Sequence, residues 1–134
     1  MQKQVKILSI DDDPNVHMIV KKVLESKSYQ VITALDGEEG LRKVMEEKPD
    51  LIILDVIMPG RTGFEICREL KTLHKYHAFA NIPVLMLTVY PDDREQRHLS
   101  IREGMTTEAD DYLHKPFNPD ELLARVEKML EKIS

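Results

Sequence analysis

Acidic side chains follow two of the short apolar runs in this sequence of 134 residues. Asp11 and Asp12 come directly after the first run, and Asp55 comes directly after the third. Carboxylates that crowd one site repel one another unless a cation neutralises them. Oxygen ligands favour Mg²⁺, which takes one or two carboxylates and keeps positions for water and a phosphate. We therefore expect Asp11 and Asp12 to bind Mg²⁺ beside Asp55.

A hydroxyl and an amine end two later runs, at Thr88 and Lys115. A metal alone would not require either group, whereas the oxygens of a phosphoryl group need several positive or hydrogen-bonding partners. With a metal present, a carboxylate can attack phosphorus and form an aspartyl phosphate. Asp55 by itself would be interpreted as a strand-end carboxylate bonded to its own turn. Together with the other four side chains, it is predicted to be the nucleophile.

Other acids in the chain have simpler interpretations. Asp13 precedes Pro14, the pattern of an N-cap followed by proline in the first helical turn, so its carboxylate is expected to cap a helix. Asp36 and Asp120 are also expected in caps, the second within Asn118–Glu121, which repeats the same pattern. The remaining loop acids are expected to be solvated and are given no chemistry: Asp92, Asp93, Asp110 and Asp111.

The elements that would position these side chains alternate along the chain. Short runs rich in β-branched and apolar residues predict five strands, at Val5–Ile10, Val31–Leu35, Leu51–Leu54, Val84–Thr88 and Tyr112–His114. Strands that alternate with helices form right-handed βαβ units, which build a mostly parallel sheet with helices on both faces. Ligands of such a doubly wound α/β sheet bind outside the carboxyl ends of the strands, where the acids stand.

Apolar residues at helical spacing predict four helices between and after these strands. The four stripes consist of Val16, Ile19, Val20, Val23 and Leu24; of Leu41, Val44 and Met45; of Phe64, Cys67, Leu70 and Leu73; and of Leu122, Leu123, Val126, Met129, Leu130 and Ile133. The region from Pro91 to Asp110 is more polar, and either a poorly anchored helix or a mobile loop is expected there. His17, although it lies beside the acids, is expected on the surface.

Composition and motif content argue against several classes of protein. The formal charge of −5 argues against nucleic acid as a direct partner, because phosphate binding needs a basic face. With Cys67 as the sole cysteine, an intrachain disulfide cannot form. The chain has no apolar stretch of membrane-spanning length and a polar start, so we expect a cytoplasmic protein without membrane insertion. A glycine-rich phosphate loop is also missing, which disfavours ATP and NAD.

Four motifs, in this order along the chain, carry a resemblance to a known family. They are Ile7–Pro14, Asp55–Gly60 with Gly63, Leu87–Thr88 and Ala109–Phe117. With these motifs the chain resembles the receiver domain of two-component response regulators from Lys6 to the C-terminal helix. The resemblance implies one CheY-like domain over residues 1–134. It also implies the flavodoxin-like fold, with five parallel strands in the order 2-1-3-4-5 and five helices.

The resemblance implies a role for each acid of the cluster. Asp55 would be the phosphoacceptor. Asp12, Asp55 and the backbone carbonyl of Ile57 would bind Mg²⁺, and Asp11 would bind it directly or through a water molecule. These assignments make Mg²⁺ the cofactor of a reaction that the protein catalyses only on itself.

Further roles implied by the resemblance lie around the phosphoryl group. Thr88 and Lys115 would bind its oxygens, and the bond from Lys115 to Pro116 would be cis. Tyr112 matches a switch position whose ring turns inward as the Thr88 hydroxyl moves toward the phosphoryl group, although simple packing would also account for it. Val89 replaces a small residue of the family, and its branched side chain is expected to narrow access. Equal phosphorylation rates for Val89→Ala and the wild type would contradict this.

The resemblance also implies partners. A sensor histidine kinase or a phosphotransfer protein would donate the phosphoryl group. The surface around the fourth helix, the fifth strand and the fifth helix would contact a downstream protein of unknown identity, and phosphorylation would favour a homodimer. The stretch from Thr88 to Lys115 is longer than the family pattern, which puts the fourth helix in doubt, and a smaller excess lies near His74–His77.

Two other functions remain open. One is a binding module that does not depend on phosphorylation, although the complete set of acids, Thr88 and Lys115 argues against it. The other is a phosphohydrolase with an aspartate nucleophile, which is disfavoured because no second acid stands two residues after Asp55. A fragment of a longer regulator would show the same sequence features as a stand-alone domain.

Overall fold

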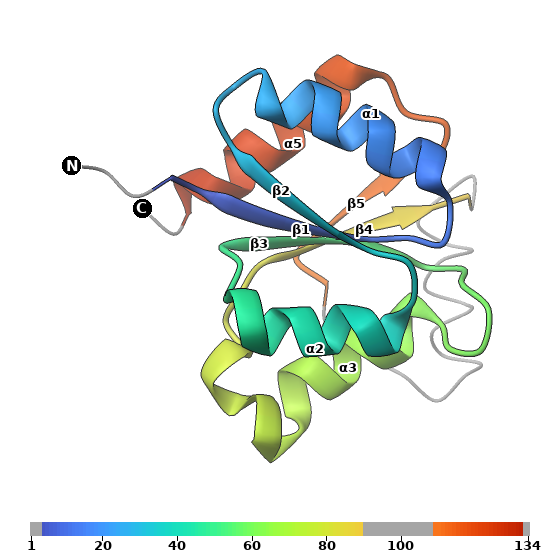
Figure 1. The fold of residues 1–134 in the computed structure, drawn as a ribbon, viewed down its shortest axis with the longest axis vertical. Coiled ribbons are helices and arrows are strands. Elements are labelled where there is room, and N and C mark those ends of the chain that lie inside the picture. Colours follow the sequence, from blue (N-terminus) through green and yellow to red (C-terminus); the bar gives the residue numbers. More distant parts are fainter. Residues whose placement is uncertain (1–3, 90–108, 133–134) are drawn as a thin grey trace.

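The central feature is a parallel sheet, seen in a computed structural model that describes residues 4–89 and 109–132 (Figure 1). Its strands are β1 Lys6–Ile10, β2 Gln30–Ala34, β3 Leu51–Asp55, β4 Val84–Thr88 and β5 Asp111–His114. Their order across the sheet is β2-β1-β3-β4-β5, and each neighbouring pair is parallel. The predicted fold class and strand order are therefore confirmed.

Helices cover both faces of the sheet. They are α1 Pro14–Glu25, α2 Gly37–Glu47, α3 Gly63–Thr72, the short 3-10 helix η1 His74–Phe79 and α5 Pro119–Glu131. Helices α1 and α5 lie on one face, and α2 and α3 lie on the other (Figure 1). The fourth helix of the predicted fold would fall within residues 90–108, which lie outside the described residues.

Two hydrophobic cores fill the spaces between sheet and helices. Alternate residues of β1 show the division, because Leu8 packs with the α2 and α3 side chains and Ile7 packs with those of α1 and α5. Every residue of β3 is buried. A strand covered on both faces needs a continuous apolar run rather than an alternating one, which is why Leu51–Leu54 carries no polar residue.

Side-chain caps fix where four of the described helices begin, and Thr62 is the cap of α3. The Asp13 carboxylate accepts a hydrogen bond from the Asn15 backbone N–H at 2.9 Å, and Asp36 accepts one from that of Glu39 at 2.8 Å. Before α5 the cap is Asn118, which accepts from the Glu121 N–H at 2.8 Å. The expectation of Asp120 in a capping role is therefore wrong. Asp120 lies inside the first turn of α5, where its negative charge interacts favourably with the helix dipole.

Some residues of the predicted stripes and loops are placed differently. Ile19 and Met45 are exposed, because each lies at the edge of its helix's buried stripe, and Leu73 is exposed because α3 has ended at the residue before it. Two acids expected to be solvated have partners. Asp111 accepts a hydrogen bond from the Arg125 guanidinium at 2.8 Å, and Asp110 accepts one from the backbone N–H that begins β4, also at 2.8 Å.

The turn from β3 into α3 brings two backbone segments into close contact. Gly63 begins α3, and its N–H donates to the carbonyl of Val56 at 2.7 Å. A Cβ atom on Gly63 would collide with the carbonyl oxygen of Asp55. Only glycine leaves room for this approach, which holds the helix start directly against the end of β3.

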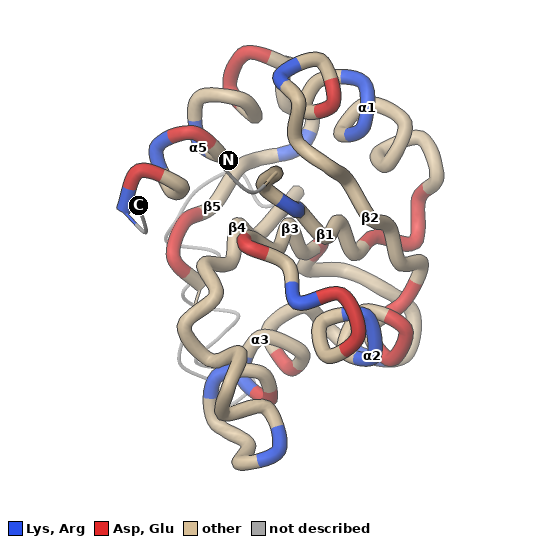
Figure 2. The backbone as a smooth tube through the Cα atoms, turned by 60° about the vertical axis from the view of Figure 1, so that its left-hand side comes forward, with Lys and Arg blue, Asp and Glu red and all other residues tan. Residues whose placement is uncertain are grey.

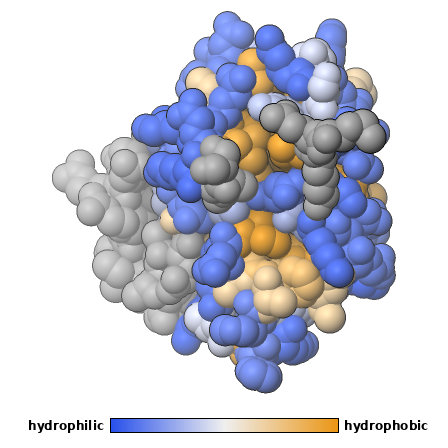
Figure 3. Space-filling model, turned by 90° about the vertical axis from the view of Figure 1, so that its left-hand side faces the viewer, coloured by the Kyte–Doolittle hydropathy of each residue, from blue (hydrophilic) through white to orange (hydrophobic). Residues whose placement is uncertain are grey.

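The surface of the described residues is mixed in character. Basic and acidic positions are interspersed along α2 and α5 (Figure 2). At the end of the molecule where the strands begin, hydrophobic residues show in the middle of the face and hydrophilic residues surround them (Figure 3). Among the described helices, none combines the length and the hydrophobicity that crossing a membrane requires.

Candidate functional site

Three carboxylates meet at the carboxyl end of the sheet. Strands β1 and β3 are parallel neighbours, so Asp11, which follows β1, lies beside Asp55, the last residue of β3. Each of Asp11, Asp12 and Asp55 offers an oxygen within 4.8 Å of the others. Asp11 and Asp55 are buried, whereas Asp12 is exposed. The structure thus brings together the acids that the sequence placed at two separate strand ends.

Lys115 reaches this cluster from the end of β5, the strand at the edge of the sheet. It follows β5, and its Nζ lies 2.9 Å from Asp11 Oδ2 and 3.1 Å from Asp55 Oδ1. Its backbone N–H donates to the Thr88 carbonyl at 2.6 Å, which ties the end of β5 to the end of β4. The peptide bond from Lys115 to Pro116 is cis. One ammonium group therefore bridges two of the three acids.

Thr88 and Tyr112 lie on the neighbouring strands β4 and β5. Thr88 is the last residue of β4 and is completely buried. It pairs in register with His114, two residues after Tyr112. The Tyr112 ring is partly buried and packs against the core on the α2 and α3 side. Thr88 thus ends its strand beside the site, and Tyr112 lies two residues further back along the sheet, opposite Met86.

The surroundings of Asp55 oppose its negative charge. Burial has the largest effect and the neighbouring charge of Asp11 adds to it, so that the pKa of Asp55 rises to about 6. Lys115 and the backbone N–H of Ile57 act in the opposite direction. For Lys115, burial works against the charged form, but hydrogen bonds and the charges of Asp11 and Asp55 outweigh it and raise its pKa. The amine therefore stays charged between the two acids.

The donor set fits a hard divalent cation. Asp11, Asp12 and Asp55 present carboxylate oxygens, the ligands that Mg²⁺ prefers, and their spacing lets one ion reach all three. Burial raises the pKa of Asp55 most and the charge of Asp11 adds to it, so a cation beside the two carboxylates would favour the ionised form of Asp55. These three acids would hold the ion.

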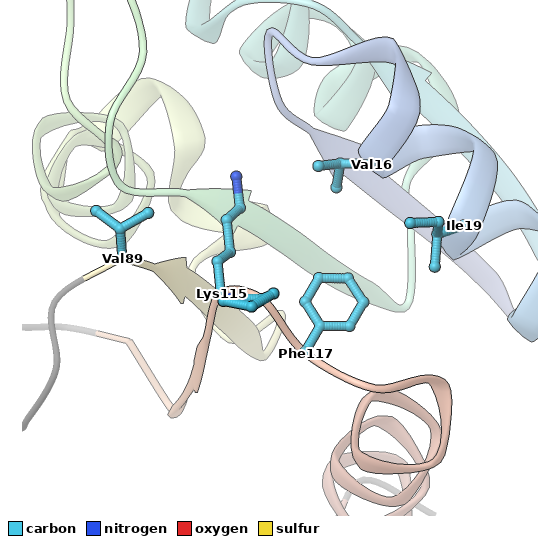
Figure 4. Close-up of a pocket in the computed structure, with 6 residues that line it drawn as sticks. Val16, Ile19, Val89, Lys115 and Phe117 are labelled. Atoms are coloured by element: carbon cyan, nitrogen blue, oxygen red, sulfur yellow. The ribbon is translucent and has the colours of Figure 1, made fainter.

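A small apolar pocket opens beside Lys115 (Figure 4). Its volume is about 280 Å³, and its lining comes from α1, from the end of β4 and from the segment after β5. Val89 stands on one side of the Lys115 side chain, and the Phe117 ring stands on the other, toward Val16 and Ile19 of α1 (Figure 4). Val89 and Lys115 thus line the same pocket.

The prediction for His17 is also wrong. It was expected on the surface, but it is only 6% exposed and its ring is hydrogen-bonded beneath the acids. The spacing could have shown this, because His17 stands three residues before Val20 and seven before Leu24, both buried. A histidine at an inward-facing helical position needs internal hydrogen-bond partners, and here they come from β1, from β2 and from the acidic segment itself.

Comparison with known families identifies the class of protein. The model of the response regulator receiver domain matches residues 7–127, so the chain belongs to that family. Members of this family are signalling modules of two-component systems, and phosphorylation of an aspartate is characteristic of them. The resemblance inferred from the four motifs is therefore confirmed.

Among curated proteins, full-length transcriptional regulators are similar to this chain. It is 42% identical over 127 residues to the alkaline phosphatase synthesis transcriptional regulatory protein PhoP of Bacillus subtilis, covering 95% of this chain and 49% of that protein. It is 35% identical over 127 residues to the DNA-binding response regulator MtrA of Mycolicibacterium smegmatis, covering 95% of this chain and 51% of that protein. The chain thus spans about half the length of these relatives.

Solved structures of receiver proteins share the fold. A two-component response regulator from Clostridium difficile superposes with a TM-score of 0.79 at 30% identity, covering 98% of this chain and 99% of that one. The chemotaxis protein CheY4 of Vibrio cholerae gives a TM-score of 0.78 at 33% identity, covering 95% and 99%.

Proposed function

We propose that this chain is a receiver domain over residues 1–134 in which Asp55 accepts a phosphoryl group in a Mg²⁺-dependent reaction. The observation that carries the proposal is the cluster of Asp11, Asp12 and Asp55 with the Lys115 amine bridging two of them. The site consists of a buried carboxylate with a raised pKa, two further acids and one amine, so its acidic groups outnumber its basic ones. A divalent cation and a phosphoryl group together would complete it.

The positions of the side chains support the following course for the proposed reaction. An Asp55 carboxylate oxygen attacks phosphorus, the new O–P bond forms, and the bond to the donor breaks and leaves its electron pair on the donor. Bound Mg²⁺ would neutralise the acids and the phosphoryl oxygens, with Asp11, Asp12, Asp55 and the Ile57 carbonyl as its protein ligands. Lys115 exchanges its contact with the Asp55 carboxylate for a phosphoryl oxygen.

The remaining residues of the site have supporting roles in this proposal. The Thr88 hydroxyl binds a second phosphoryl oxygen. The Tyr112 ring turns inward as this hydroxyl moves toward the phosphoryl group. Val89 slows access to the site. Thr88 and Tyr112 lie on β4 and β5, so the change reaches the surface of β5 and α5. The predicted fourth helix of this surface lies outside the described residues.

The proposed partners are proteins. A sensor histidine kinase or a phosphotransfer protein donates the phosphoryl group, and a downstream protein or a second copy of the chain reads the phosphorylated surface. We place the protein in the cytoplasm, without membrane insertion or direct contact with nucleic acid. DNA binding is a property of the similar regulator MtrA. Catalysis is limited to the protein's own phosphorylation and dephosphorylation.

Intact-mass measurement tests this proposal. Wild-type protein incubated with acetyl phosphate and Mg²⁺ is expected to gain one phosphoryl group, and EDTA should prevent it. Asp55→Asn should gain none, since the amide cannot form the acyl phosphate. Asp50→Asn is the matched control, because Asp50 is an acid at the opposite end of β3 that accepts a hydrogen bond from the Lys6 backbone N–H. An unmodified wild type, or an undiminished adduct in Asp55→Asn, would overturn the proposal.

A further inference from the structure

His17 occupies a buried position beneath the acid cluster that the proposed reaction does not use. It lies in the first turns of α1, and its ring faces the space between β1 and β2. The ring contacts groups from three places: the Ser9 hydroxyl within β1, the Asp11 carbonyl after β1, and the Ala34 carbonyl at the end of β2. A single side chain thus connects the acidic segment with two strands.

The contacts determine which ring nitrogen carries a hydrogen. Nε2 lies 2.8 Å from the Asp11 carbonyl oxygen and 3.1 Å from that of Ala34. Carbonyl oxygens only accept hydrogen bonds, so Nε2 must be the donor to both. Nδ1 lies 3.1 Å from Ser9 Oγ, whose hydroxyl can donate to it. Both nitrogens therefore have partners, which a buried imidazole requires.

The carbonyl that His17 holds belongs to the peptide unit between Asp11 and Asp12. The same segment is fixed at two further points: the Asp11 N–H donates to the Ala34 carbonyl at 3.1 Å, and the Asp13 N–H donates to Asp11 Oδ1 at 2.9 Å. Asp12 itself is exposed, so the direction of its carboxylate depends on the backbone that precedes it. Rotation of this one peptide plane would move the two acids relative to each other.

We propose that His17 is a positioning residue for the cation site, acting through its Nε2–H on the Asp11–Asp12 peptide. This inference rests on the proposed function, because it assumes that these acids bind Mg²⁺. Hydrogen bonds behind metal ligands hold the ligands in their productive geometry, and losing one typically weakens metal affinity about tenfold or more. His17 would thus preorganise two of the three acids before the ion arrives.

Two substitutions of similar polarity separate this role from simple packing. The glutamine of His17→Gln can place its amide nitrogen close to the position of Nε2, whereas the shorter asparagine of His17→Asn reaches only as far as Nδ1. We therefore expect His17→Gln to keep Mg²⁺ affinity within about threefold of the wild type and His17→Asn to weaken it about tenfold. Isothermal titration with MgCl₂ alone measures both. Amide spectra of the metal-free proteins should show Asp12 and Asp13 displaced in His17→Asn and close to the wild type in His17→Gln.

Unfolding of a variant does not remove the test. If His17→Asn is unfolded, Ser9→Ala frees the ring by removing the Nδ1 partner and is expected to weaken Mg²⁺ affinity about threefold. The inference would be overturned by wild-type Mg²⁺ affinity in His17→Asn or by equal losses of affinity in His17→Asn and His17→Gln. If His17→Asn is unfolded, an unchanged Mg²⁺ affinity in Ser9→Ala would overturn it.

Acetyl phosphate labelling of the same preparations distinguishes the two levels of the proposal. A wild type that neither binds Mg²⁺ nor gains a phosphoryl group would overturn the proposed function and this inference with it. A wild type that does both, compared with a His17→Asn protein that binds Mg²⁺ equally well, would overturn the inference alone.

Discussion

The carboxylate of Asp55 lies where burial and the charge of Asp11 both oppose ionisation, and its pKa rises to about 6. An unfolded chain would give this acid an ordinary pKa near 4. Between these values the folded state binds the proton more tightly than the unfolded state does. The contribution of Asp55 to the free energy of unfolding is therefore fully favourable below about pH 4 and is lost as the pH rises through about 6. At neutral pH Asp55 is therefore ionised, and its buried charge destabilises the folded state.

Asp55→Asn is accordingly expected to stabilise the metal-free protein at neutral pH. The free energy of unfolding in EDTA should rise by about 2 kcal/mol at pH 7, because the buried charge is gone, and the difference should shrink toward pH 4. Urea denaturation at several pH values measures it. Asp12→Asn is the control, since that acid is exposed. A variant that is less stable than the wild type at pH 7 would contradict the prediction.

At the scale of elements, the site depends on how strands end and how helices begin. Parallel strands place their carboxyl ends at one edge, and Asp13, Thr62 and Asn118 cap the helices that start there. The tightest of these connections is that from β3 into α3, where Gly63 has no room for a side chain. The position of Asp55 is thus coupled to the start of α3.

Gly63→Ala is expected to destabilise the protein by about 2 kcal/mol or more. The new methyl group would collide with the Asp55 carbonyl and force the backbone of the two segments apart. Gly60→Ala is the matched control in the same loop. Gly60 has a φ of 85° but open space around it, so only backbone strain of about 1 kcal/mol is expected. Urea denaturation compares the two, and equal losses would show that the collision does not decide the cost.

At the scale of the whole molecule, the site joins residues from three distant parts of the chain. Asp11, Asp55 and Lys115 follow or end the strands β1, β3 and β5, so an unfolded chain cannot assemble them. A ligand that binds only the folded state adds its binding free energy to stability, about 1.4 kcal/mol at ten times its dissociation constant.

Mg²⁺ should therefore raise the melting temperature of the wild type, and removing it with EDTA should reverse the gain. Asp12→Ala is expected to fold as well as the wild type in EDTA, because Asp12 is exposed, but to lose most of the gain from Mg²⁺. Calorimetry at matched ionic strength, with NaCl replacing MgCl₂, measures both effects. The same gain in Asp12→Ala as in the wild type would exclude Asp12 as a ligand.

Much of the fold could be read from local patterns. Short apolar runs identified the five strands to within one residue at each end, because a strand covered on both faces has no polar face to interrupt it. Caps at Asp13 and Asp36 were evident because capping uses a side chain next to the helix it begins. The stripes were less reliable at their edges, as exposed Ile19 and Met45 show, since neighbouring helices decide how far a buried stripe extends.

The sequence by itself determined which residues gather at the site: Asp11, Asp12, Asp55, Thr88 and Lys115 each end or follow a strand, and parallel strands end together. The environment of these residues was decided by the tertiary structure alone. The raised pKa of Asp55, the bridge from Lys115 and the burial of His17 all depend on distances between segments far apart in the chain. No local pattern encodes such distances, because they exist only once both faces of the sheet are packed.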